Sequence, residues 1–217
     1  MLRIGIPAGI QLMMFDFSNL IVQSSINSFG DTTIAAWIAY GKTDAWTWQI
    51  SGALGVSVTT FVGQNFGAQK YDRVRRSVLV CMGLGIAMVG TLSILEFTCR
   101  ESLLGIFTTD PEVIRIGSKM MMMYIVLWNT IFIPIEVLAG TMRGTGYALP
   151  PTVIMCVCVC LFRILWILLA VDKWHTVFAV CLAYPISWVL CVLTFAVFYI
   201  KGSWLHGRIK AMGMPPY

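Results

Sequence analysis

The sequence predicts an all-α integral membrane protein, a bundle of six transmembrane helices, on three observations. Of its 217 residues, 58% are hydrophobic and only 12% are charged, whereas a soluble domain carries about 25% charged residues. The mean hydropathy is +0.81. Apolar runs of about 20 residues, the length that crosses a hydrocarbon layer, follow one another along the chain, and the segments between them are rich in Gly, Pro, Asp and Asn.

The six predicted spans are residues 4–28, 32–62, 77–99, 113–142, 152–171 and 175–200. The first run exceeds the apolar core of a signal peptide and has no clear small-residue cleavage site after it, so we interpret it as a retained span. The second and fourth runs are longer than a perpendicular span requires and should tilt, break or emerge into water. Gly41, Gly52 and Gly55 are candidate bending points in the second run, and Pro134 in the fourth.

Lys and Arg residues outside the spans indicate the orientation. Nine fall on the face that carries both termini: Arg3, Lys70, Arg73, Arg75, Arg76, Arg143, Lys201, Arg208 and Lys210. Four fall on the other face: Arg100, Arg115, Lys119 and Lys173. The positive-inside tendency places the first face, with both termini, in the cytoplasm, and we expect a bacterial plasma (inner) membrane. Residues 201–217 are predicted to be a basic cytoplasmic tail.

The basic segment at residues 70–76 favours contact with lipid headgroups rather than nucleic acid, because it joins two apolar helices. The seven cysteines lie in or at the ends of apolar runs and form no metal or disulfide pattern. His175 and His206 are the only histidines, and neither HExxH nor GxSxG is present. The sequence therefore disfavours a membrane-embedded hydrolase, and we expect a protein that is not an enzyme and needs no cofactor.

Charged residues inside the first two spans point to a function. Asp16 lies about 18 Å along its helix, near mid-depth, and Asp44 falls at a similar depth. Because an ionised group there costs about 3 kcal/mol or more, both should face a bundle interior or a wet cavity. Lys42 and Asp44 are two residues apart and cannot pair on a regular helix. Asp16 is a candidate partner for Lys42, which would leave Asp44 free to exchange a proton; the alternative is a salt bridge that only fixes packing.

Glu136 and Arg163 are a second candidate pair. Arginine's long side chain can cover much of their difference in depth, which predicts a bridge between the fourth and fifth helices that is structural or contributes to coupling. Glu96 lies at the outer end of the third run, where a solvated carboxylate is ordinary, and it is assigned no function.

Five stretches together resemble a known family: "GIPAGIQ", "NLIVQSSINSFG", "TFVGQNFGAQKYDRVRRSV", "RGTGYALPP" and "FRILWI". In order and spacing they are similar to the second half of multidrug and toxic compound extrusion (MATE) transporters. The resemblance implies that residues 1–200 are the C-terminal six-helix lobe of an exporter whose two lobes face each other across a cavity. It further implies export of amphipathic, often cationic compounds, driven by inward flow of Na⁺ or H⁺, through rocking of the lobes without ATP.

The resemblance also implies site residues. Many members have an acid near Asp16, associated with cation coupling or substrate attraction; it would be a metal ligand if the coupling ion is Na⁺. Relatives often have Gly-Asn-Ile-Glu where this chain has Gly41, Lys42, Thr43 and Asp44, so Asp44 matches the acid and Lys42 departs from the pattern. The matched stretches also contain a cytoplasmic loop motif at Gly63, Gln64, Asn65, Gly67, Arg143 and Gly144.

The chain is about half the length that a MATE transporter needs, so a second six-helix lobe is an expected partner, together with membrane lipid and a small amphipathic or cationic substrate. Three interpretations stay open: a fragment of a longer protein, a half-transporter that dimerises, and a lobe that pairs with a separate chain. Two other functions also stay open. One is a non-transporting remnant or interaction module, and the other is a flippase for lipid-linked precursors.

Overall fold

The structure is a computed structural model in which the described residues are 2–122, 128–201, 205 and 209. The α-helices are α1 (Leu2–Asn27), α2 (Asp31–Gly67), α3 (Tyr71–Thr98), α4 (Arg100–Gly105), α5 (Pro111–Met120), α6 (Asn129–Gly144), α7 (Leu149–Met155), α8 (Phe162–Trp166), α9 (Asp172–Trp174) and α10 (Val177–Lys201). Two π-helical segments, η3 (Cys156–Leu161) and η4 (Ile167–Val171), make α7 to α9 one continuous helical run. The all-helical prediction is confirmed for the described residues.

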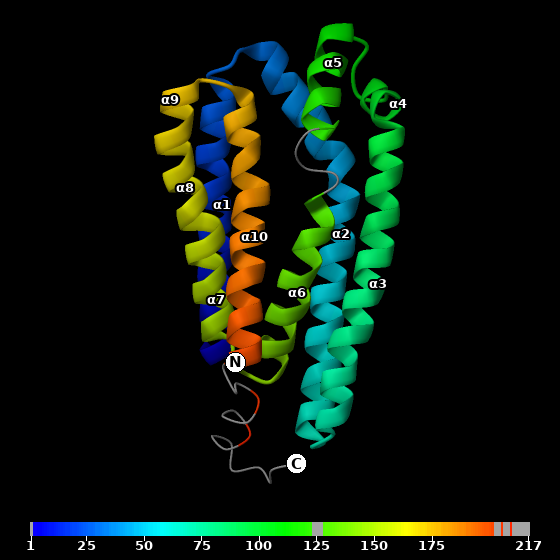
Figure 1. Cartoon of the computed structure of the whole chain (residues 1–217), viewed down its shortest axis with the longest axis vertical. Helices are drawn as coiled ribbons and strands as arrows, with labels where there is room; N and C mark the ends of the chain where they lie inside the picture. Colours follow the sequence, from blue (N-terminus) through cyan, green and yellow to red (C-terminus); the bar gives the residue numbers. More distant parts are fainter. Residues whose placement is uncertain (1, 123–127, 202–204, 206–208, 210–217) are drawn as a thin grey trace.

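The helices form two groups that lie side by side (Figure 1). In one group α2, α3 and α6 pack on one another, and in the other α1 and α10 pack on the run from α7 to α9. Helix α10 also contacts α6 and joins the groups. The start of α1, the end of α10 and the α2–α3 and α6–α7 turns lie at one end of the bundle, while α4 and α5 lie at the other (Figure 1).

Four described helices are long and apolar enough to cross a membrane: Gly5–Asn27, Tyr71–Thr98, Leu149–Val171 and Val177–Lys201. Large apolar side chains also cover their outer faces, as at Leu79 and Ile200, which are 73% and 80% exposed. The chain is therefore an integral membrane protein. The third span begins at Tyr71 and the fifth at Leu149, a few residues before the predicted starts, because a charged first turn belongs to α3 and the prolines after Leu149 fit the first turn of α7.

The second and fourth predicted spans are the longest. Helix α2 has 37 residues, about 55 Å of helix, and it continues through Gly41, Gly52 and Gly55. Of the fourth predicted span, the described residues include α5 and α6. Helix α5 begins at Pro111, where the Asp110 carboxylate accepts a hydrogen bond from the Glu112 amide at 2.8 Å, an ordinary N-cap. Residues 123–127 of this span lie outside the described residues.

The predicted cytoplasmic loop motif lies in helix instead. Helix α2 continues past Val62 to Gly67, so Gly63, Gln64, Asn65 and Gly67 form its last turns, and Arg143 and Gly144 form the last turn of α6. The buried Asn65 side chain donates to the Phe61 carbonyl at 2.8 Å. The glycines and polar residues of this segment led to the wrong prediction of a loop after Val62, because in the structure they lie within helices and contribute to helix packing. Most of the predicted tail 201–217 lies outside the described residues, and that domain division stays a prediction.

Small residues bring α2 and α6 into close contact. A Cβ atom added at Gly140 would lie 2.8 Å from the Gly55 carbonyl oxygen, and one at Gly144 would lie 2.6 Å from the Thr59 carbonyl oxygen. The Thr59 hydroxyl donates across the interface to the Gly140 carbonyl at 3.1 Å. Close backbone approach at small residues is the usual way in which helices associate in membranes, and it holds α6 against α2.

Candidate functional site

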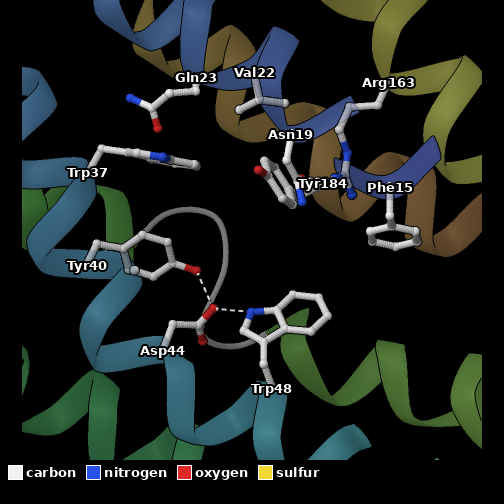
Figure 2. A pocket seen from close by; sticks show the side chains of 11 residues that line it. Phe15, Asn19, Val22, Gln23, Trp37, Tyr40, Asp44, Trp48, Arg163 and Tyr184 are labelled. Carbon is white, nitrogen blue, oxygen red and sulfur yellow. Dashed lines mark hydrogen bonds between the residues drawn. The ribbon is translucent and has the colours of Figure 1, made fainter. Parts of the chain in front are cut away.

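A pocket of about 410 Å³ lies between α1, α2, α8 and α10 (Figure 2). We call it the Asp44 pocket, and its lining combines aromatic rings with a few polar groups. The lining residues are Phe15, Asn19, Val22, Gln23, Trp37, Tyr40, Gly41, Asp44, Trp48, Arg163 and Tyr184.

Three neutral donors hold the Asp44 carboxylate, which is 3% exposed. The Tyr40 hydroxyl donates to Oδ2 at 2.8 Å and the Trp48 indole donates to Oδ2 at 2.7 Å, one helical turn before and after it (Figure 2). The Asn129 amide donates to Oδ1 at 2.6 Å. Asn129 is the first residue of α6. Among the described residues, Asp44 is held by neutral donors and belongs to no salt bridge.

Lys42 and Asp16 do not form the suggested pair. Lys42 is exposed, with Nζ 5.6 Å from the centre of the Phe107 ring, while Asp44 points into the pocket from another side of α2. Asp16 is exposed on α1 and does not line the Asp44 pocket. In the described part of the chain neither residue belongs to a salt bridge, because they lie on separate surfaces.

Arg163 lies in the wall of the Asp44 pocket and is 1% exposed. Its guanidinium carbon is 4.0 Å from the centre of the Tyr184 ring, a cation–π contact, and Nη1 donates to the Asn19 side chain at 3.4 Å. The predicted Glu136–Arg163 bridge is therefore wrong. Arg163 is turned toward α1 and α10, and Glu136 has a partner on its own helix.

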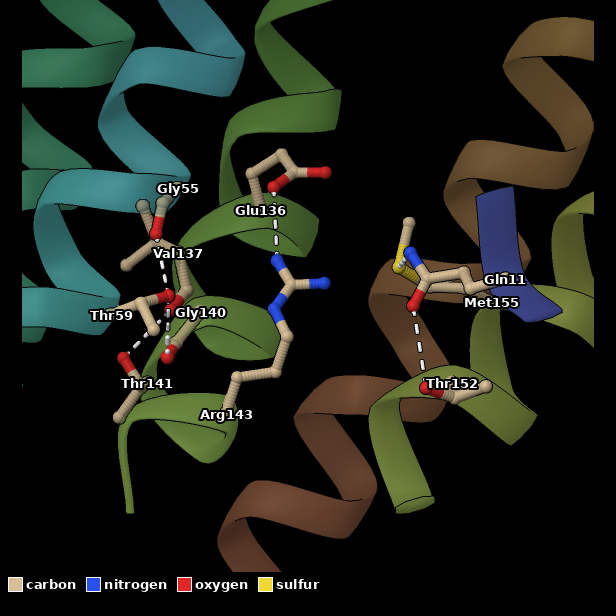
Figure 3. A network of polar contacts seen from close by, with 10 residues as sticks. All are labelled: Gln11, Gly55, Thr59, Glu136, Val137, Gly140, Thr141, Arg143, Thr152 and Met155. Carbon is tan, nitrogen blue, oxygen red and sulfur yellow. Dashed lines mark hydrogen bonds and ion pairs between the residues drawn. The ribbon is translucent and has the colours of Figure 1, made fainter. Parts of the chain in front are cut away.

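Glu136 pairs with Arg143, whose Nη2 lies 3.3 Å from the Glu136 carboxylate (Figure 3). The pair lines a second pocket of about 310 Å³ between α1, α2 and α6, which we call the Glu136 pocket. On α1, the Gln11 amide donates to the Met155 sulfur at 3.1 Å. The Glu136 pocket lies near the end of α6, because Arg143 in the last turn of that helix lines it (Figure 3).

The sequence interpretation missed Glu96. Its side chain is buried at 3% exposure, and the Thr47 hydroxyl donates to Oε1 at 3.1 Å. A depth counted from the end of the apolar run placed it in solvent, but the side chain faces α2, where Thr47 contacts it. Among the described residues, no group of three His, Cys, Asp or Glu side chains could hold a metal ion.

A helical membrane bundle with a buried carboxylate in a pocket between its helices has features of a secondary transporter lobe. A family model described as MatE matches residues 7–169, and the chain belongs to that family. The resemblance found in the sequence is thus confirmed, and the family is one of transporters rather than enzymes.

Two relatives show the degree of similarity. The chain is 30% identical to the probable multidrug resistance protein YoeA of Bacillus subtilis over 155 residues, which cover 71% of this chain and 33% of YoeA. It is 27% identical to the probable multidrug resistance protein NorM of Thermotoga maritima over 158 residues, 70% of this chain and 33% of that protein. The matched part therefore spans about a third of these relatives.

Solved structures share the fold. The crystal structure of a MATE transporter in complex with MaD3S superposes with a TM-score of 0.85 at 17% identity, covering 93% of this chain and 45% of that one. A MOP superfamily transporter from Pyrococcus furiosus gives 0.80 at 18% identity, with 93% and 44% covered. The chain thus has the fold of one lobe of such proteins.

Proposed function

We propose that this chain is one lobe of a cation-coupled antiporter that exports amphipathic compounds, and that it works with a second six-helix lobe. The observation that carries the proposal is the Asp44 pocket, where a buried carboxylate without an ion-pair partner lies among aromatic rings. Aromatic faces and a carboxylate attract lipophilic cations. The relatives that the chain matches are multidrug resistance proteins, which supports the same substrate class.

Coupling follows from the charge of Asp44. An H⁺ or Na⁺ that neutralises the carboxylate weakens the three hydrogen bonds that it accepts. One of the three donors, Asn129, is the first residue of α6. Ion occupancy therefore favours one position of α6 relative to α2, and a rocking movement of the lobes follows from such a bias. Asp16 faces away from the pocket on exposed α1, and we assign it to the surface that meets the second lobe.

The second lobe can be a further part of the same protein, a separate chain or a second copy. The start of α1 and the end of α10 lie at one end of the bundle, so two copies inserted in the same direction would be related by an axis along the membrane normal. We place that end in the cytoplasm of a bacterial cell, because described residues of the predicted cytoplasmic set, such as Lys70 in the α2–α3 turn and Arg143 in the last turn of α6, belong to it.

The test is efflux of ethidium, a lipophilic cation, from proteoliposomes in which H⁺ and Na⁺ gradients are imposed separately. Two proteins are tested: this chain, and a tandem fusion of two copies of it. We expect gradient-dependent efflux, and we expect Asp44→Asn to reduce the rate at least tenfold, whereas Asp72→Asn, an exposed carboxylate in the first turn of α3, keeps it.

Efflux that is equal in wild type and Asp44→Asn would contradict the role of Asp44. No gradient-dependent efflux from either form would favour the remnant or interaction module. Movement of a fluorescent lipid-linked substrate in place of ethidium would favour the flippase.

A further inference from the structure

Five buried polar side chains lie on α2 and α3, and we call them the polar track. On α2 they are Asp44, Thr47 and Ser51, which share one face because they are three and four residues apart. On α3 they are Ser93 and Glu96. Each of the five is 3% exposed or less, and the Thr47 hydroxyl joins the helices by its hydrogen bond to Glu96.

The two carboxyl groups in this track have different surroundings. Asp44 accepts three hydrogen bonds, whereas Glu96 accepts one, from Thr47 to Oε1. Glu96 Oε2 is buried and has no hydrogen-bond partner among the described atoms, and the same is true of Ser93 Oγ, one helical turn earlier on α3. Burying an oxygen without a partner costs about 1–3 kcal/mol, and more if it is charged.

The cations near this end of α3 are engaged elsewhere. The Arg100 guanidinium donates to the Phe97 carbonyl at 2.8 Å and to the Ser118 hydroxyl at 2.9 Å. Lys42 points to Phe107, and Lys119 is exposed on α5. The described part of the chain therefore gives Glu96 no cationic partner.

The group that donates to Glu96 is neutral, and the nearest ionisable side chain to it along α2 is acidic. Asp44 lies one helical turn from Thr47 on α2, Asn129 on α6 carries no charge, and Glu101 on α4 is exposed. Two ionised carboxylates separated by one helical turn and one hydrogen bond would repel each other where little water screens them. Pairs of carboxyl groups in unlike surroundings commonly divide into one acid and one anion.

We propose that Glu96 is a proton-binding site inside the membrane, holding a proton on Oε2 while Asp44 is ionised, so that the two groups carry one negative charge. The proton removes the buried charge, and the new O–H group can donate where the carboxylate had no donor. When a cation neutralises Asp44, an ionised Glu96 is no longer repelled by a second negative charge. The O–H bond of Glu96 then breaks and its proton leaves to solvent. This last step rests on the proposed antiport function, but the resting charge state does not.

Infrared spectroscopy of the chain in lipid bilayers at neutral pH tests the charge state directly, because ordinary Glu and Asp side chains are ionised there. We expect a C=O stretching band of a protonated carboxylic acid in wild type. Glu96→Gln should abolish the band, while Glu101→Gln, the exposed control, keeps it. Ser93→Ala should shift its frequency, and Asp44→Asn should weaken it. Circular dichroism checks that each variant is folded.

A band that survives Glu96→Gln, or the absence of such a band in wild type, would overturn the proposal. Loss of the band when Na⁺ is added at constant pH would instead support the last step, in which a cation that neutralises Asp44 releases the proton of Glu96. Since the spectrum needs no transport, a chain that fails in ethidium efflux can still pass this test, and a chain that transports can still fail it.

Discussion

Arg143 Nη2 lies 3.3 Å from the Glu136 carboxylate and joins two residues that are seven positions apart on α6. Their side chains are 19% and 16% exposed, so the pair is largely removed from water and faces the Glu136 pocket. The sequence interpretation had assigned Arg143 to a cytoplasmic loop and Glu136 to a partner on another helix. The ion pair instead spans two turns of one helix, at the level where α2 and α6 are closest.

Removing one partner of this pair should destabilise the fold. Arg143→Met leaves the Glu136 carboxylate largely buried without a partner, and we expect a loss of about 1–2 kcal/mol after allowance for partial exposure. Thermal unfolding in detergent measures it. Arg143→Lys should retain most of the stability, and the double variant Glu136→Gln, Arg143→Met should be more stable than Arg143→Met alone. If the double variant is the least stable of the three, the pair does not act as described.

Gly55→Ala should disrupt the same ion pair from α2. The added Cβ would lie 2.5 Å from Glu136 Oε2, so the end of this flexible side chain must move and its contact with Arg143 is disturbed, and we expect a small loss of about 1 kcal/mol. Gly52→Ala is the matched control, because a Cβ there meets no atom within 4 Å, and Ala should stabilise that helix position by about 0.5–1 kcal/mol. Equal unfolding temperatures for the two variants would be evidence against the close α2–Glu136 contact.

The α2–α6 interface should not accept larger residues at its glycines. Gly140→Ala and Gly144→Ala place a methyl group 2.8 Å and 2.6 Å from backbone oxygens of α2, and backbone atoms cannot move aside as a flexible side chain can. We expect each to lower stability by about 1–3 kcal/mol. Gly83→Ala on α3, where a Cβ meets nothing within 4 Å, serves as the control. Wild-type stability of both interface variants would show that the helices are further apart.

A double-mutant cycle can report the charge of Asp44. Tyr40→Phe removes one donor, and Asp44→Asn removes the carboxylate. If Asp44 is ionised, their coupling free energy from unfolding experiments should be about 1.5–3 kcal/mol, the strength of hydrogen bonds to charged groups. A coupling of about 1 kcal/mol or less would indicate a neutral Asp44 and contradict its role as the anion of the pocket.

The membrane fold could be predicted because apolar runs report it directly. The end of α5 at Met120 and the start of α6 at Asn129 could not be located, since no Gly or Pro stands between these residues. The boundary of α2 was missed for the opposite reason: Gly63 and Gly67 suggested a loop, although Gly63 is a helix-packing residue whose added Cβ would lie 3.3 Å from the Gly144 carbonyl.

The site was predictable only where spacing is local. Tyr40 and Trp48 lie four residues on either side of Asp44, a helical spacing that could have identified both as donors. Asn129 is 85 residues away, and no pattern in one sequence pairs them. Glu136 and Arg163 were paired by depth alone, which ignores the direction in which each side chain points. Glu96 was misjudged because its depth does not show that the side chain faces α2 and contacts Thr47.

Because α2 is one long uninterrupted helix, a movement of one part of it also moves its end. From Asp44 to Gly67 the helix runs 23 residues without interruption, about 35 Å, so a tilt at the pocket reappears as a displacement of the α2–α3 turn on the opposite side of the membrane. A probe attached at that turn would sense what is bound to a carboxylate it never touches.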